Sequence, residues 1–147
     1  MSSLPKANHS VESRRSSSRV SREARHILNP PLRVLARPLG MRVYGFELIV
    51  TDISNSGMLL VSATKALIPF TNGVKINATI DLSCRLFNRP IYANLEVMRT
   101  SLRDDEEISP ELAQRQLFGV IISKIEPDHK IYFEEGLLSL SNSRQTR

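Results

Sequence analysis

The alternation of residues 74–82, V-K-I-N-A-T-I-D-L, constrains the fold of this chain more than any other feature. Apolar side chains at every second position face one way and polar side chains, ending with Asp81, face the other. This is the pattern of a β-strand with one buried and one wet face. Residues 91–100 alternate again, and strand-like runs cover 32–37, 43–53, 58–63 and 117–125. No helical pattern separates these runs, so we expect an antiparallel barrel or sandwich.

A single helix is expected after the last strand. Pro127 suits the first position of a helix, and Asp128 favours the positive end of the helix dipole. Apolar side chains recur along one side, although Gly136 weakens the helix by roughly 1 kcal/mol relative to Ala. Residues 141–147 are predicted to form a disordered tail, so the folded domain is expected to span residues 26–140.

The first 25 residues are predicted to form a flexible arm rich in Ser and Arg. They contain six basic and two acidic residues and so carry +4 of the formal net charge of +5. Large apolar side chains are few, so burial cannot offset the entropy lost on ordering. We expect the arm to be disordered alone and to become ordered on an anionic partner.

Cysteine content and the lack of long apolar runs limit where the protein works. Cys84 is the one cysteine, which excludes an intramolecular disulfide, and its strand-like surroundings predict a small buried residue. No signal-peptide pattern and no run of about 18 apolar residues is present, so no membrane insertion is expected. The expected compartment is the reducing cytoplasm.

The sequence offers no constellation typical of an enzyme. His9, His26 and His129 form no pair with metal-ligand spacing. The acidic run at 104–107 predicts a solvated loop rather than a paired acid and base. A glycine-rich phosphate loop is also missing. We therefore expect a non-enzymatic protein with no metal and no cofactor.

Two polar features have the chemistry to bind a guanine nucleotide. Arg15 and Arg19 place two planar, permanently charged guanidiniums on the arm, which can pair with phosphates or with guanine. The turn after the second strand contains Asp52, whose carboxylate can accept from a guanine or orient an arginine. Ser54 adds a donor and acceptor, and Gly57 allows a positive φ and close backbone approach. Each feature alone is also typical of a solvated tail or an ordinary Asx-type loop.

In their order, the Arg-x-x-x-Arg pair and the Asp-x-Ser-x-x-Gly turn resemble the PilZ domain, the bacterial receptor domain for cyclic di-GMP. The strand pattern after the turn and the closing helix resemble it as well, over residues 15–140. The resemblance implies a six-stranded antiparallel β-barrel with a C-terminal helix. It also implies that the arm wraps over the ligand, which family members often bind as a stacked, intercalated pair.

Roles for single residues follow from the same resemblance. Arg15 and Arg19 would contact phosphates and guanine edges or faces. Asp52 and Ser54 would bind a guanine, and Gly57 would shape the turn. The family's second arginine stands closer to the first strand than Arg19 does. The arm register therefore stays open, and the rival or auxiliary contacts are Arg14, Arg22 and Arg25.

The expected function is a cyclic di-GMP receptor whose arm changes conformation on binding and signals to an unidentified partner protein. Motility, polysaccharide or adhesion control are the outputs that the resemblance allows. One alternative is a degenerate PilZ-like adaptor that binds protein but no nucleotide. A second is a small basic nucleic-acid-binding barrel, which is disfavoured because aromatic residues are only 5% and the body is nearly neutral.

Overall fold

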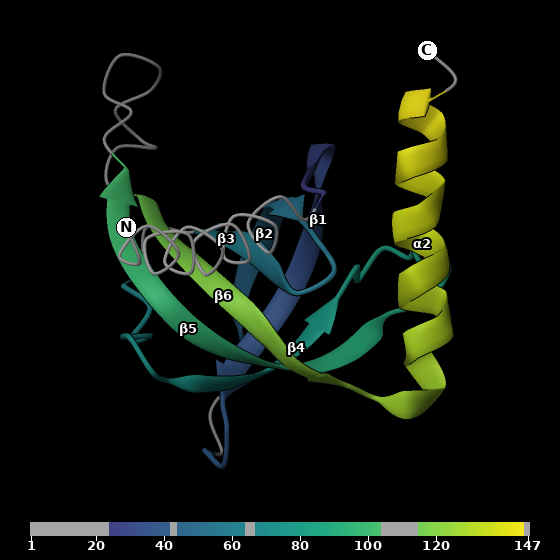
Figure 1. Ribbon diagram of the computed structural model, residues 1–147. Helices are drawn as coiled ribbons and strands as arrows, with labels where there is room; N and C mark the ends of the chain where they lie inside the picture. Colours follow the sequence, from purple (N-terminus) through teal and green to yellow (C-terminus); the bar gives the residue numbers. More distant parts are fainter. Residues whose placement is uncertain (1–23, 42–43, 64–66, 104–114, 146–147) are drawn as a thin grey trace, which may run out of the picture.

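The computed structural model describes residues 24–41, 44–63, 67–103 and 115–145. These residues form a closed barrel of six antiparallel strands and one helix (Figure 1). The elements are β1 (His26–Pro38), β2 (Phe46–Ile53), β3 (Gly57–Ser62), β4 (Lys75–Ile80), β5 (Ile91–Arg103), β6 (Arg115–Ile125) and α2 (Pro127–Gln145). Around the barrel the order is β1-β2-β3-β6-β5-β4. The expected six-stranded barrel with a closing helix is confirmed, and the sandwich is not formed.

Two boundaries differ from the sequence-based expectation. β1 begins at His26, well before the predicted start at residue 32. Pro30 and Pro31 do not stop it, because its pairing with β2 is irregular between Ile27 and Leu32 and needs no ladder N–H there. The helix continues to Gln145, past the tail expected from residue 141.

The loop between β4 and β5 corrects two further expectations. Asp81, predicted on the wet face, is fully buried, and its carboxylate accepts N–H bonds from Arg85 at 2.9 Å and from Leu86 and Phe87 at 2.8 Å each. Cys84 is exposed in this loop rather than buried in a strand. The strand ends at Ile80 because the buried carboxylate turns the backbone, with φ 64° at Asp81 itself.

The helix α2 packs against this same loop and stands along one side of the barrel (Figure 1). Phe133 of α2 stacks on Phe87 with ring centroids 5.3 Å apart. Beside it, a Cβ on Gly136 would lie 2.3 Å from Phe87 Cδ1. The glycine thus lets the helix approach the ring closely. No helix in the described part of the chain is long and apolar enough to cross a membrane.

The barrel interior is filled by large, fully buried side chains from all six strands. They include Val34, Leu48, Val50, Leu60, Ile76, Ile80, Ile91, Leu95, Val97 and Phe118. The expectations for residues 1–23, for the solvated acidic loop at 104–107 and for residues 146–147 lie outside the described residues.

Candidate functional site

A β-bulge in β2 turns Asp52 toward the outside of the barrel. Val50 is buried, so simple alternation would place Asp52 in the core. Val50 and Asp52 instead pair with adjacent residues of β3, which makes Thr51 an extra residue. As a result Ile53, 1% exposed, takes the inner position. The side chain of Asp52 faces outward and is 20% exposed.

The polar turn between β2 and β3 is closed by Ser54. Its N–H donates to Gly57 O at 2.9 Å, and its Oγ accepts from Gly57 N–H at 3.2 Å. The hydroxyl can also donate to Gly57 O, 3.3 Å away. Ser56 O accepts from Ile122 N–H at 2.8 Å, which fixes the turn to β6. Ser54 is buried and already holds the turn, so its expected contact with a guanine stays a prediction.

Gly57 serves the turn by its missing side chain rather than by its backbone angle. The described glycines with positive φ are Gly40 and Gly73, so Gly57 does not use the positive φ that a glycine allows. Close backbone approach is the reason for this glycine, because a Cβ would lie 2.8 Å from Val120 O. The absence of that carbon lets the start of β3 lie tightly against β6.

Arg25 brings a cation to this turn. It directly precedes β1, and Ile27 of β1 pairs with Asp52. Arg25 Nη1 lies 4.0 Å from Asp52 Oδ2, and the arginine side chain is 66% exposed. Such a long, exposed ion pair contributes little to stability, about 0–1 kcal/mol. Arg25, expected as an auxiliary contact, is the arm arginine that the structure describes, and the other four, Arg14, Arg15, Arg19 and Arg22, lie outside the described residues.

Arg99 is a second cation on this surface, and sequence reasoning did not single it out. Each residue in one outward-facing row pairs with the next across successive strands: Ile27, Asp52, Leu59, Gly119 and Arg99. A Cβ on Gly119 would lie 3.6 Å from Arg99 Nε, so the side chain of Arg99 extends across the bare glycine. A glycine opposite an arginine on the neighbouring strand is the signal that could have identified it.

The row combines groups that suit a flat, anionic ligand. Arg25 and Arg99 lie toward its two ends, and Asp52 presents a carboxylate between them. The half-buried Leu59 and Gly119, which has no side chain, form a flat surface between these groups, on which an aromatic ring can lie. Within the described ranges, no group of three or more His, Cys, Asp or Glu side chains could hold a metal ion.

Comparison with known proteins rests on structure. No protein-family model and no curated protein matches the sequence. The PilZ domain with c-di-GMP of YcgR from Escherichia coli is similar with a TM-score of 0.63 and 14% identity, covering 85% of this chain and 94% of that one. The K. pneumonia MrkH–c-di-GMP complex is similar with a TM-score of 0.62 and 16% identity, covering 84% of this chain. The Bacillus subtilis inhibitor of motility MotI/DgrA is similar with a TM-score of 0.57 and 20% identity, covering 83% of this chain.

These similarities establish the fold alone, because the identities are low. This chain spans only 52% of the MrkH chain and 52% of the MotI/DgrA chain. It spans nearly all of the YcgR PilZ domain, at 94% of that chain. The protein therefore has the fold of a PilZ domain.

Proposed function

We propose that this protein is a receptor that binds cyclic di-GMP on the outer face of the barrel, beside the turn 54–57. The observation that carries the proposal is the placement of Arg25 4.0 Å from Asp52 at the end of that turn. Two structurally similar proteins, YcgR and MrkH, are described as complexes with c-di-GMP. This chain shares their fold and presents cations and a carboxylate of its own at this surface. Both observations support the same ligand here.

The ligand has two phosphates and two guanines, and the row offers partners to both. The carboxylate of Asp52 accepts from the N1–H and N2–H₂ of one guanine. The guanidiniums of Arg25 and Arg99 pair with phosphates or with the O6/N7 edge of a guanine. Arg15 and Arg19, with Arg14 and Arg22 as auxiliary contacts, close over the ligand from the arm. The spare arginines suit an intercalated pair of ligand molecules.

Binding then works as a signal through the arm. Ordering a basic segment costs conformational entropy, which several charge-assisted contacts can offset. The ordered arm changes the surface shown to a partner protein, in control of motility, polysaccharide or adhesion. Cyclic di-GMP is a messenger here and not a substrate, so no catalysis is proposed.

Calorimetric titration of cyclic di-GMP into the purified protein tests this function. We expect micromolar or tighter binding by the wild type. Asp52→Asn and Arg25→Ala should each weaken binding about tenfold or more, because a hydrogen bond to a charged group contributes about 1.5–3 kcal/mol. Lys130→Ala, which removes an exposed cation from α2, is the matched control and should bind as the wild type does.

The same titration decides the arm register and the alternatives. Loss of binding in Arg19→Ala supports the literal Arg15/Arg19 motif, whereas loss confined to Arg25→Ala shifts the register toward the barrel. No heat with the wild type would overturn the receptor function and leave a nucleotide-free adaptor. Strongly salt-dependent binding of arbitrary oligonucleotides instead would favour the nucleic-acid barrel.

A further inference from the structure

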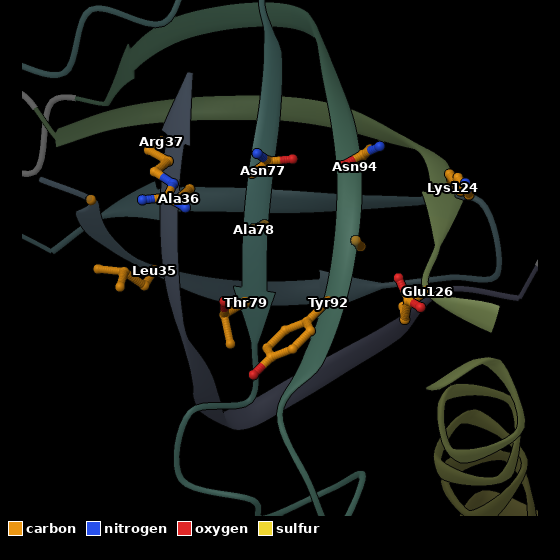
Figure 2. A pocket seen from close by; sticks show the side chains of 12 residues that line it. Leu35, Ala36, Arg37, Asn77, Ala78, Thr79, Tyr92, Asn94, Lys124 and Glu126 are labelled. Atoms are coloured by element: carbon orange, nitrogen blue, oxygen red, sulfur yellow. The ribbon is translucent and has the colours of Figure 1, made fainter. Parts of the chain in front are cut away.

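A second concave surface lies on the outer face of β1, β4, β5 and β6, away from the turn. It is a groove of about 530 Å³ that includes Arg37, Asn77 and Asn94 (Figure 2). Asp52 pairs with Ile27 near the start of β1, whereas Arg37 lies near its end. Ala36, the neighbour of Arg37, pairs with Phe46, so the two surfaces are separated by about six residues of β2, or roughly 20 Å at a rise of about 3.3 Å per residue.

Two asparagines face each other in the middle of this groove. A row runs across four strands, each member pairing with the next: Arg37, Asn77, Asn94 and Lys124. Figure 2 shows these four side chains at one level of the sheet, with Thr79 and Tyr92 at the level below. Asparagine is depleted in strands, so an opposed pair in the centre of a sheet does not serve strand stability. Residues that depart from the usual amino-acid preferences of a strand in this way indicate a functional role.

The polar groups of the row have unused binding capacity. Within the part of the chain that the structure describes, the side chains of Asn77 and Asn94 make no hydrogen bond. Over the same described residues, neither Arg37 nor Lys124 forms an ion pair. The groove therefore presents two amides, each a donor and an acceptor, between two cations that form no ion pair with a described acidic residue, although Glu126 also lines the groove.

We propose that this groove docks an extended acidic segment of a partner protein. Side-chain amides match the donors and acceptors of a peptide main chain. Strands lie about 4.8 Å apart, so the Cα atoms of Arg37 and Lys124 are about 14 Å apart, a distance that about four residues of extended chain span. The segment therefore carries two acidic side chains about four residues apart, one for each cation.

The rim of the groove favours a protein over other anions. Tyr92 is 54% exposed and Leu35 is 43% exposed, and both line the groove. Tyrosine and arginine beside apolar area are typical of protein interfaces. The proposal needs no nucleotide, so it stands or falls separately from cyclic di-GMP binding.

Pooled synthetic peptides test the docking surface. One pool carries two glutamates about three to five residues apart in an extended Ser/Thr/Val background, and a matched pool carries glutamines. Both are applied to the full-length protein without cyclic di-GMP, and retained peptides are then measured by fluorescence anisotropy. We expect the glutamate pool to be enriched about tenfold or more, since acidic groups meet two cations. Equal retention of both pools, or no retention, would overturn the proposal.

Four variants and a control locate the binding. Arg37→Glu and Lys124→Glu should each lower the affinity for the retained peptides about fivefold or more through charge reversal. Asn77→Thr and Asn94→Thr remove the amides and introduce threonine, which is favoured in strands. Both variants should therefore fold and should also bind the peptides more weakly. Lys130→Glu makes the same change in net charge on α2 and should have no effect.

Two results from these variants would contradict a specific partner site. An equal loss in Lys130→Glu would mean that the peptides respond to net charge alone. If the wild type sediments as a dimer and Arg37→Glu sediments as a monomer, the groove is occupied by a second copy of this chain rather than by a partner protein. Asp52→Asn serves as the reciprocal control, because it should weaken nucleotide binding about tenfold or more and leave peptide binding unchanged.

Discussion

Ser54 and Gly57 close the same hairpin turn by different means. Ser54 uses its hydroxyl, which accepts from Gly57 N–H at 3.2 Å. Gly57 contributes by lacking a Cβ, which would meet Val120 O at 2.8 Å. Neither task requires a ligand. Both residues thereby shape the surface on which Asp52 and Arg25 lie.

The close contact at Gly57 predicts that adding one methyl group, in Gly57→Ala, destabilises the protein. Gly57→Ala should lower the free energy of unfolding by about 1–3 kcal/mol, the usual range for overpacking. It should also weaken cyclic di-GMP binding, because a displaced hairpin moves Asp52. Urea denaturation and calorimetric titration measure the two effects. Asn55→Ala changes an exposed neighbour in the turn and should stay within about 0.5 kcal/mol of the wild type. A Gly57→Ala protein of unchanged stability would contradict the contact.

At the scale of strands, alternation predicted the existence of the elements better than their ends and irregularities. β4 and β5 were evident because each has one buried and one wet face. The buried Asp81 was misplaced, since alternation cannot show that a loop turns back to donate three N–H bonds to one carboxylate. The bulge at Thr51 could not be predicted either. A bulge is defined by how β2 pairs with β3, and the sequence of β2 alone does not show that pairing.

The candidate site was predictable to a similar degree. Asp52, Ser54 and Gly57 were found from their order in the sequence, and the structure places all three at one turn. Arg99 could not be found in this way, because the register between β5 and β6 is what places it across Gly119. The motif thus identified the turn, and the pairing of strands identified its neighbours.

The docking of α2 supplies a prediction in which two effects oppose each other. Gly136→Ala improves helix propensity by about 1 kcal/mol. A Cβ at this position, however, would lie 2.3 Å from Phe87 Cδ1, and the buried ring is stacked on Phe133. We expect the overpacking cost of about 1–3 kcal/mol to prevail, so that Gly136→Ala lowers the melting temperature.

The matched variants for this prediction separate propensity from packing. Glu135→Ala changes an exposed residue next in the same helix and should leave the melting temperature nearly unchanged. Phe87→Leu in the Gly136→Ala background should recover part of the loss, because it removes the ring that the methyl group meets. A higher melting temperature for Gly136→Ala alone would mean that helix propensity prevails.

At the scale of the whole molecule, α2 lies beside both proposed binding surfaces, the nucleotide site and the groove. Near its start, His129 Nδ1 accepts from the N–H of Tyr92, which lines the groove, at 3.1 Å. Near its end, Ser141 Oγ lies 3.5 Å from Nε2 of His26, the residue after Arg25. A small cavity of about 170 Å³ separates α2 from the turn and is lined by Asn55 and His26 among others. The helix thus lies beside both surfaces, in addition to the strands that form them.

Because the proposed nucleotide site joins β1, β2, β3, β6 and β5, ligand binding should stabilise the entire barrel. At a cyclic di-GMP concentration of 100 times Kd, binding to the native state alone adds about 2.7 kcal/mol. For a domain of this size that raises the melting temperature by about 5–10 °C, at about 2–4 °C per kcal/mol. Differential scanning fluorimetry measures the shift. GMP should give none, and the Asp52→Asn variant, whose affinity is lower by about tenfold or more, should give a smaller shift at the same ligand concentration. An equal shift in Asp52→Asn would place the ligand elsewhere on the barrel, because a site without the carboxylate of Asp52 is then sufficient for binding.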